Sequence, residues 1–296
     1  RNIPAAFAEL NAPLTRKLEV NGAVRVDKVG DTDASLVPKL SARYEVNKSF
    51  MLRGTFAHGF RAPNVAETGK VALAAFNNGV TDPKRCATAN RIYDVLKNGT
   101  ALDKADSLRA RDLGCSVSFA SAVQGNPDLE PEKSRSFNAG FVIEPIKNLS
   151  LTLDYYKIER RNEIGTRDTD EVLASEDLVP GSVNRLAVTA DDLRLAARAS
   201  ELSGQSFTWP VGPVASLNRR YENLHKTRVE GLDMEINHRA NLGSYGRLVT
   251  NVKANYQLDY RTWDSIENDY SENLVGNYYN WRYNVRAATT WAKGGW

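Results

Sequence analysis

The sequence lacks any apolar run approaching the roughly 18 to 20 residues that a membrane-spanning helix needs. Of its 296 residues, 42% are hydrophobic and 25% are charged, which fits one large unit or two ordinary domains. The absence of long apolar runs excludes helical membrane spans, but it does not exclude a membrane protein. A strand of an outer-membrane barrel needs only about ten residues, and only every second one is apolar.

The sequence also lacks an excess of charge of either sign. Lys and Arg total 39 against 36 Asp and Glu, for a net charge of +3. The basic residues are scattered and form no stripe of the kind that nucleic acid demands, so nucleic acid is excluded as a partner. An initiating Met and a signal peptide are missing too. We therefore expect an internal fragment of a longer protein, for which a missing signal says nothing about compartment.

Cysteine is scarce, since Cys86 and Cys115 are the only two. Both fall in one long polar segment, which favours a disulfide that closes a loop in an oxidising compartment over two unrelated thiols. Neither Cys nor His shows the spacing of a metal site. A glycine-rich phosphate loop and a Ser-His-Asp arrangement in a credible context are absent as well. We expect no cofactor, no metal and no catalytic activity.

What the sequence does contain is strict alternation of apolar and polar residues, the signal of a half-buried strand. In LEVNGAVRVDK, for example, Leu18 and Val24 alternate with Glu19 and Arg25. Each alternating segment exceeds the five or six residues usual for strands of soluble sheets. Nine such segments are predicted: 5–14, 18–29, 36–46, 50–62, 134–145, 149–164, 227–239, 247–263 and 278–291.

The connections between these segments alternate in length. The first, third, fifth and seventh are short, whereas the longest, 63–133 and 165–226, are both even-numbered. Alternation alone fits a soluble β-sandwich as well as a barrel. In a sandwich, however, there is no reason for the long loops to occur only at even-numbered connections. Short turns at one rim and long loops at the other are typical of outer-membrane barrels. We therefore predict an all-β, antiparallel transmembrane barrel with long external loops, in which Leu18, Val24, Leu151 and Leu258 touch lipid.

The exit of the strand in FMLRGTFAHGFRAPNVAE is a candidate site. The strand is expected to end at the Arg61-Ala62-Pro63 step, after which the first long external loop begins. Arg61, Asn64 and Glu67 would then line a vestibule for a ligand, or simply cap the strand end. Trp209 and Tyr221, in the second long loop, would contact a ligand or belong to the interfacial aromatic girdle.

The external loops are predicted to contain short helices. Thr189 is a plausible N-cap of a helix that stops at Gly204. A second short helix is predicted to end at Gly114. Among the aromatic residues on strands, Tyr260, Trp281 and Trp291 are assigned to the girdle.

Several stretches resemble successive barrel strands of TonB-dependent outer-membrane receptors. The most specific are the Gly-Phe-Arg-Ala-Pro-Asn strand exit and the Asn-Pro-Asp-Leu-Glu-Pro-Glu-Lys-Ser re-entry. The resemblance covers nearly the whole chain, in the expected order. The stretches are AFAELNAPL, LEVNGAVRVDKVG, LRGTFAHGFRAPNVAE, GNPDLEPEKSRSFNAGFVIEP, LSLTLDYYKIERRNEI and TRVEGLDMEINHRANLGSYGRL.

This resemblance implies a 22-stranded barrel that encloses an N-terminal plug in the outer membrane of a Gram-negative bacterium. Such receptors bind a scarce nutrient, commonly a ferric siderophore, cobalamin or a glycan. The TonB protein and its inner-membrane energy-coupling complex then act on the plug. Residues 1–296 would be a partial barrel domain of about nine or ten strands, with the plug, the TonB box and the C-terminal strands absent.

Two other functions compete with this interpretation. A passive outer-membrane porin has the same wall without a plug. A secreted β-rich binding module would never enter a lipid bilayer, and its apolar strand faces would be covered by protein.

Overall fold

A computed structural model describes residues 4–29, 34–70, 72–264 and 268–294. The chain divides into two compact units. The first comprises Arg1–Pro63, Glu130–Ile164 and Asn223–Trp296, and the second comprises Asn64–Leu129 and Gly165–Glu222. The two segments of the second unit nearly coincide with the two predicted long loops, 63–133 and 165–226. Each segment ends four residues before the predicted end of its loop.

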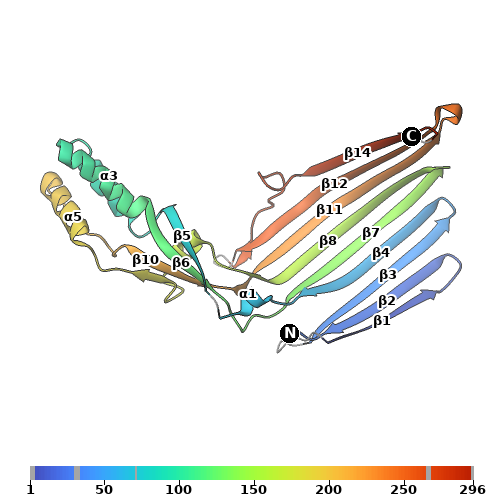
Figure 1. The fold of residues 1–296 in the computed structure, drawn as a ribbon, viewed down its shortest axis with the longest axis horizontal. Helices are drawn as coiled ribbons and strands as arrows, with labels where there is room; N and C mark the ends of the chain where they lie inside the picture. Colours follow the sequence, from blue (N-terminus) through green and yellow to red (C-terminus); the bar gives the residue numbers. More distant parts are fainter. Residues whose placement is uncertain (1–3, 30–33, 71, 265–267, 295–296) are drawn as a thin grey trace. The chain divides into compact units, whose positions relative to one another are not determined.

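The first unit is a single antiparallel sheet of ten strands, shown side by side in Figure 1. The strands follow the order β1-β2-β3-β4-β7-β8-β11-β12-β13, and β14 also pairs with β12. Each of the nine predicted segments contains a strand, but the ninth begins at Tyr283, so Trp281 lies before the strand on which it was predicted, and the two-residue β13 was not predicted. The strands are β1 Ala5–Pro13, β2 Leu18–Asp27, β3 Ser35–Asn47, β4 Phe50–Arg61, β7 Glu132–Ile146, β8 Leu149–Gly165, β11 Glu222–Asn241, β12 Arg247–Asp264, β13 Asp269–Tyr270 and β14 Tyr283–Ala292.

The predicted positions of the short connections, at every odd-numbered place in the strand order, are also confirmed. Tight turns join β1 to β2, β3 to β4, β7 to β8 and β11 to β12, the last through the 3-10 helix η1, Gly243–Tyr245. Because each strand runs antiparallel to its neighbour, all these turns lie at one end of the sheet. The long connections after β4 and β8 therefore leave from the opposite end.

Cross-strand pairing places the apolar residues of successive strands on one face, because partners in an antiparallel pair share a face. Leu40 pairs with Gly22 and with Phe56, which in turn pairs with Phe137. The face is not covered by protein: Leu40 is 57% exposed, Phe56 44% and Val285 62%. Val24 and Leu258 are each 39% exposed, and Leu18 and Leu151 are half-buried. Both clusters of buried hydrophobic side chains found in the described residues belong to the second unit.

A bulge between β11 and β12 changes which β12 residues share the apolar face. Glu230 pairs with Asp259, but Gly231 pairs with Gln257, so Leu258 is the extra residue. Beyond this bulge Tyr260 pairs with Val229, on the face opposite Glu230. The prediction that Tyr260 continues the apolar face, and with it the girdle, is therefore wrong. A period of two read along a single strand cannot reveal a bulge, because the bulge exists only in the pairing of two strands.

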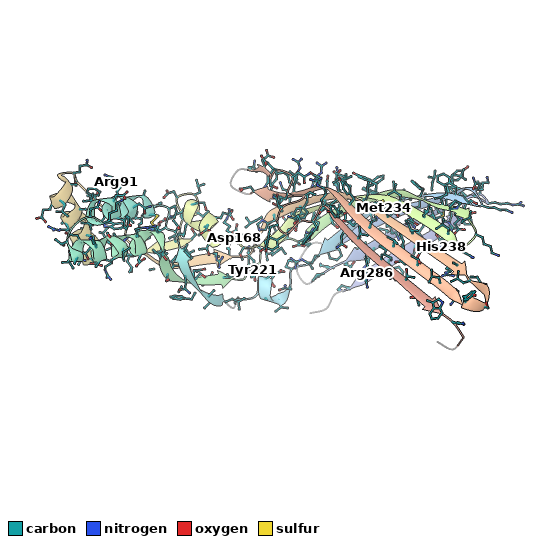
Figure 2. The ribbon with its side chains drawn as sticks, turned by 90° about the horizontal axis from the view of Figure 1, so that it is seen from above. Arg91, Asp168, Tyr221, Met234, His238 and Arg286 are labelled. Atoms are coloured by element: carbon teal, nitrogen blue, oxygen red, sulfur yellow. A yellow bond between two sulfur atoms is a disulfide. The ribbon has the colours of Figure 1, made fainter. Side chains whose placement is uncertain are left out.

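Side chains project from both faces of the strands in Figure 2. On β11, the labelled Met234 and His238 pair with Ala254 and Thr250 of β12, which places them on the apolar face. Arg286 of β14 pairs with a lysine of β12 and lies on the polar face. The two faces therefore differ in polarity along the whole width of the sheet.

The second unit contains a four-stranded sheet that the sequence reading missed. Its order is β5-β6-β10-β9, and the β10–β6 pair is parallel. These strands are short and interrupted by helices, so no sustained alternation marks them. The strands are β5 Ala72–Val80, β6 Val117–Gln124, β9 Val183–Arg185 and β10 Val214–Arg220, and the helices are α1 Val65–Thr68, α2 Cys86–Leu96, α3 Ala101–Cys115, α4 Thr169–Ala174 and α5 Ala190–Ser203.

Local sequence explains the boundaries of α5. In a capping box, the Thr189 hydroxyl accepts a hydrogen bond from the backbone N–H of Asp192, and the Asp192 carboxylate accepts one from the backbone N–H of Thr189. The helix stops at Gly204, which adopts a left-handed backbone with φ of 69°. The predicted limits of this helix are confirmed.

The limits of α3 differ from the prediction. The helix begins at the capping residue Thr100 and runs through Gly114 to Cys115. A Cβ at Gly114 would lie 2.8 Å from the Cβ of Ala89 in α2. Gly114 therefore serves close helix packing and does not end the helix. Within the described residues, the structure has no helix with both the length and the apolar character required to cross a membrane.

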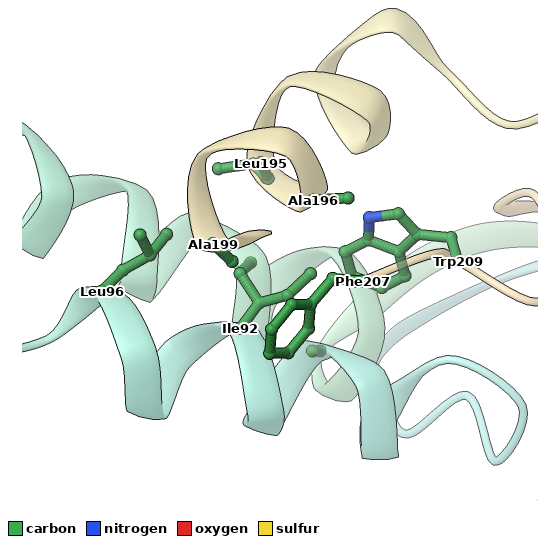
Figure 3. Close-up of a cluster of buried hydrophobic side chains, with 9 residues drawn as sticks. Ile92, Leu96, Leu195, Ala196, Ala199, Phe207 and Trp209 are labelled. Carbon is green, nitrogen blue, oxygen red and sulfur yellow. The ribbon is translucent and has the colours of Figure 1, made fainter. Parts of the chain in front are cut away.

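The core of the helical part is built from one side of α2 and one side of α5 (Figure 3). Ala89, Ile92 and Leu96 face inward at spacings of three and four residues, as an amphipathic helix requires. Leu195 and Ala199 of α5 pack against them. The segment after α5 closes this core with Phe207 and Trp209.

Candidate functional site

The polar face of the sheet carries ion pairs between different strands. An Arg43 nitrogen lies 3.0 Å from a Glu19 carboxylate oxygen. Arg53 of β4 donates to Asp154 of β8, at 2.9 Å from its Nε. These pairs are partly exposed to solvent, and exposed pairs of this kind contribute about 0 to 1 kcal/mol each. They make the face hydrophilic more than they stabilise it.

The Arg53–Asp154 pair spans an intervening strand. Arg53 pairs in register with Gly140 of β7, and Gly140 pairs with Asp154. A Cβ at Gly140 would collide with a carboxylate oxygen of Asp154. Glycine at this position thus leaves the room in which a β4 side chain reaches a β8 side chain.

Arg61 lies at the last position of β4, as predicted, and pairs with Glu132 of β7 at 2.5 Å. The same Glu132 carboxylate accepts a hydrogen bond from the backbone N–H of Ile164 at the end of β8. Asn223, near the start of β11, donates to the carbonyl oxygens of Glu130 and Asn162. Polar side chains therefore tie together the ends of four strands, and 43% of the Arg61 side chain is exposed.

Asn64 and Glu67 form the capping box of the short helix α1. Asn64 accepts from the Glu67 backbone N–H at 2.9 Å, and the Glu67 carboxylate accepts from the Asn64 N–H at 2.7 Å. Asn126 links this turn to Tyr221: its N–H donates to the Glu67 carbonyl, and its side chain donates to the Tyr221 carbonyl. The structure thus brings Asn64, Glu67 and Tyr221 together. Glu67 is buried, whereas Tyr221 remains partly exposed.

Trp209 lies apart from this group, in the helical core. It is only 6% exposed, and its Nε1–H donates to the Asp192 carbonyl at 2.9 Å. The guanidinium of Arg85 lies 4.2 Å from the centre of the Trp209 ring. The side chain is a packing residue, which leaves no surface for the predicted ligand contact.

Arg85 itself is fully buried and holds three parts of the second unit together. It pairs with Asp192 at 2.6 Å, and it donates to the carbonyl oxygens of Leu113 and Val211. Burial acts to raise the pKa of Asp192, but hydrogen bonds from Arg85 and Thr189 outweigh it and keep that pKa below its ordinary value. The pair is therefore charged in the folded protein.

A disulfide joins Cys86 at the start of α2 to Cys115 at the end of α3. The ring that it closes contains both helices. Outside the core, Asp103 of α3 accepts hydrogen bonds from Arg198 of α5 and from Thr100. The Arg198 hydrogen bond, and then those from Thr100, hold the pKa of Asp103 well below its usual range.

A second buried ionic group lies beside the four-stranded sheet. The Arg185 guanidinium lies 2.7 Å from Asp82, which is fully buried, and 2.8 Å from Glu176. Burial acts to lower the pKa of Arg185, but hydrogen bonds with Glu176 and Asp82 raise it above its ordinary value. Sequence reasoning missed both Arg185 and Arg85, because their buried partners Asp82 and Asp192 lie 103 and 107 residues away along the chain. Only the Thr189-x-x-Asp192 spacing carried a local signal, that of a helix cap.

Comparisons with known proteins identify the family. The model of the family described as "TonB dependent receptor-like, beta-barrel" matches residues 1–296. The chain belongs to this family.

Solved structures show the same fold. One is a ferric enterobactin receptor variant from Pseudomonas aeruginosa, with 16% identity and a TM-score of 0.59 over 99% of this chain and 30% of that chain. Another is the siderophore receptor PirA from Acinetobacter baumannii, with 14% identity and a TM-score of 0.54 over 97% of this chain and 38% of that chain. The chain thus spans about a third of the length of these receptors. A search of curated proteins found no match.

The family model describes the β-barrel of TonB-dependent receptor-like proteins. The described residues contain no group of three or more His, Cys, Asp and Glu that could hold a metal ion. Their ion pairs join structural elements to one another. The candidate residues lie at the strand ends of the first unit and in the second unit.

Proposed function

We propose that the chain is part of a receptor in a Gram-negative outer membrane that captures a scarce nutrient and imports it with energy from TonB. One observation carries the membrane part of this proposal. The first unit has an apolar face, marked by Leu40, Phe56 and Val285, that no described protein layer covers. Burying one such side chain is worth about 1.5 to 3 kcal/mol, so a whole face in water would be strongly unfavourable.

The opposite face of the same strands supports a barrel over a secreted binding module. It carries the Arg43–Glu19 and Arg53–Asp154 pairs, which suit a wet or plugged interior. A soluble sandwich instead buries its apolar face against a second sheet. The exposure of the apolar face therefore favours lipid as its neighbour.

The choice of nutrient rests on the family. We propose a ferric siderophore as the nutrient, with cobalamin or a glycan as the alternatives within the family. Support comes from two solved structures with this fold, a ferric enterobactin receptor and a siderophore receptor. Energy coupling would use TonB and a plug supplied by the rest of the receptor, as the family implies.

The binding surface would lie in the second unit and at the strand ends, on the extracellular side. Of the five predicted vestibule residues, Arg61 and Asn64 are exposed and Tyr221 is partly exposed, so these three remain candidates, Arg61 in the first unit and the other two in the second. Asn64 and Glu67 act in the α1 cap, and Trp209 acts in the core. The helices and the disulfide of the second unit would keep such a binding surface rigid without support from the membrane.

Two neighbouring alanines in β14 provide a matched test. Ala287 pairs with Val252 on the apolar face, and Ala288 pairs with Asn251 on the polar face. Ala287 is midway between Tyr283 and Trp291, which would mark the two edges of the hydrocarbon. An arginine at the midplane on the lipid side costs a barrel about 2 to 4 kcal/mol, whereas one facing the interior costs little.

In the full-length receptor, Ala287→Arg should reduce the folded, heat-modifiable form in the outer membrane, and Ala288→Arg should leave it near the wild-type amount. Val252→Arg, on the next strand, should behave like Ala287→Arg. Equal assembly of all three variants would indicate a module that never contacts lipid. Siderophore uptake that persists in cells without TonB would indicate the passive porin instead.

A further inference from the structure

Four strands carry basic residues on the apolar face, beyond its apolar part. We call this group the basic belt. Its strands are β7, β8, β11 and β12, and the belt lies at the end of the sheet from which the long connections leave. Its members are Lys133, Arg135, Lys157, Arg161, Lys226, Arg228 and Arg261.

Strand pairing fixes the face on which these side chains lie. Phe60 pairs with Lys133, and Lys133 pairs with Arg161. Arg135 lies on β7 two residues further from the tight turns than Phe137, and it pairs with Glu159. All of them share the face of Phe56 and Phe137 because residues two apart on a strand, and cross-strand partners, lie on the same face.

The transition from apolar to basic is abrupt on each strand. On β7 it falls between Phe137 and Arg135, and on β8 between Tyr155 and Lys157. On β11 it falls between Leu232 and Glu230, next to the bulge, and Glu230 pairs with Asp259. Because Glu230 accepts from Tyr155 and lies 3.0 Å from Lys157, these transitions lie at one level.

The lengths of the strands explain why a belt can lie above the hydrocarbon. β8, β11 and β12 have 17, 20 and 18 residues, whereas β1 and β2 have 9 and 10. A tilted strand needs only about 9 to 11 residues to cross the bilayer. The additional residues of the longer strands therefore reach the level of the lipid headgroups and beyond.

The belt has more positive than negative charge. The carboxylates of Glu159, Glu230 and Asp259 lie among the seven basic side chains, whereas Glu163, further along β8, pairs with Arg160 and Glu222, at the start of β11, pairs with Arg167. Glu230 is already shared between Lys157 and Arg228, and Asp259 between Arg228 and Arg261.

Among the described residues, three belt members have no acidic partner: Lys133, Arg135 and Lys226, and Lys226 lies 3.4 Å from the centre of the Trp263 ring instead. Lys133 and Arg135 are exposed, and no carboxylate among the described residues pairs with either one. Arg161 beside them is 55% exposed, and its closest carboxylate oxygen, on Glu159, is 3.7 Å away. The adjacent side chains of Lys133, Arg135 and Arg161 can therefore bind an external anion.

We infer that the basic belt binds the phosphorylated headgroup of an outer-leaflet lipid, with Lys133, Arg135 and Arg161 as its centre. This inference rests on the proposed membrane orientation. A guanidinium donates two parallel hydrogen bonds to a phosphate, and lysine adds a point charge. The apolar face continues directly below the belt at Phe137, so a bound headgroup would have its acyl chains against the sheet. That continuity selects a lipid over free phosphate.

The test uses the full-length receptor in detergent micelles, with phosphorylated lipid A, dephosphorylated lipid A and inorganic phosphate as separate probes, and native mass spectrometry as the readout. The belt variant is Lys133→Gln/Arg135→Gln/Arg161→Gln. The control is Lys39→Gln/Lys253→Gln/Arg286→Gln, which removes the same charge from the polar face, where Lys39 pairs with Ala57 and Lys253 pairs with Arg286.

Each basic residue near an anionic surface changes lipid binding by roughly fivefold, so the belt variant should bind phosphorylated lipid A on the order of 100-fold more weakly. The control should bind it like the wild type, and the wild type should bind dephosphorylated lipid weakly. Equal binding of both lipids would overturn the inference, as would inorganic phosphate that displaces the lipid at similar concentration. Heat-modifiability on gels verifies that both variants fold. If the receptor assembles normally but does not prefer the phosphorylated lipid, only the inference about the basic belt is refuted. If Ala287→Arg and Ala288→Arg assemble equally well, the proposed membrane orientation itself is refuted.

Discussion

Replacement of Arg85 by methionine tests how the second unit is held together. Arg85 and Asp192 are both fully buried, and their side chains lie 2.6 Å apart. Methionine fills much of the arginine volume but leaves the Asp192 carboxylate without its countercharge. Two carbonyl oxygens, of Leu113 and Val211, also lose a donor.

The expected cost follows from the burial of the pair. Breaking a buried ion pair by removing one partner costs about 3 to 5 kcal/mol, because an uncompensated charge stays in a medium of low dielectric. The Asp192 carboxylate keeps its hydrogen bond from the Thr189 N–H, which moderates the penalty. The double variant Arg85→Met/Asp192→Asn removes the buried charge as well and should therefore lose less stability than Arg85→Met alone.

Hydrogen exchange in the full-length receptor measures this cost locally. Amides of α2, α3 and α5 should exchange roughly 200- to 5,000-fold faster in Arg85→Met, while those of the barrel strands stay unchanged. Arg109→Met is the matched control, since Arg109 pairs with Asp191 at the surface, where it is 59% exposed. Loss of an exposed pair costs about 0 to 1 kcal/mol, so exchange should rise by less than about fivefold.

An equal effect of Arg85→Met and Arg109→Met would refute the reasoning. It would mean that the buried pair contributes no more than a surface pair. A larger loss in the double variant than in Arg85→Met would refute the claim that the orphaned charge is the main penalty.

Two further predictions concern the same helices. Replacing both Cys86 and Cys115 by serine removes a crosslink across 29 residues. This should destabilise the helical part by about 3 to 4 kcal/mol, seen as faster proteolysis between α2 and α3 in otherwise assembled receptor, and unchanged proteolysis would contradict it. The pKa of Asp103 is lower in the folded than in the unfolded chain, so its contribution to stability is fully present above the unfolded value of about 3.9 and is lost as the pH falls through the folded value. Protection of α3 amides, corrected for intrinsic exchange, should therefore be constant between about pH 5 and 7 and fall below about pH 4, and Asp103→Asn should flatten that fall.

The strands of the first unit were predictable from the sequence, and the reason is local. In a strand with one face in contact with lipid and one face polar, each residue's position alone decides its polarity. Alternation such as Leu18, Glu19 and Val20 therefore marks the strand, and tight turns mark its ends. The parity of the connections then gave the up-and-down order of the strands, because it needs only the lengths between segments.

The second unit was much less predictable. Helix α5 was found because its capping box and its terminal glycine are neighbours along the chain. The four-stranded sheet and α2 were not found, since their strands are short and the N-cap of α2, Arg85, makes no capping hydrogen bond. What positions α2 is contact with distant residues, the disulfide and Asp192.

For the first unit, the sequence by itself therefore determined which segments are strands, which of their faces is apolar below the bulge, and in which order they pair. Only the tertiary structure decided that Trp209 is a core residue, that Arg85 is buried against Asp192, and that the bulge after Glu230 turns Asp259 toward the apolar face. The physical reason is the range of the interaction. Polarity along a strand responds to the surroundings of each residue, whereas burial, ion pairing and register depend on partners that only folding brings close.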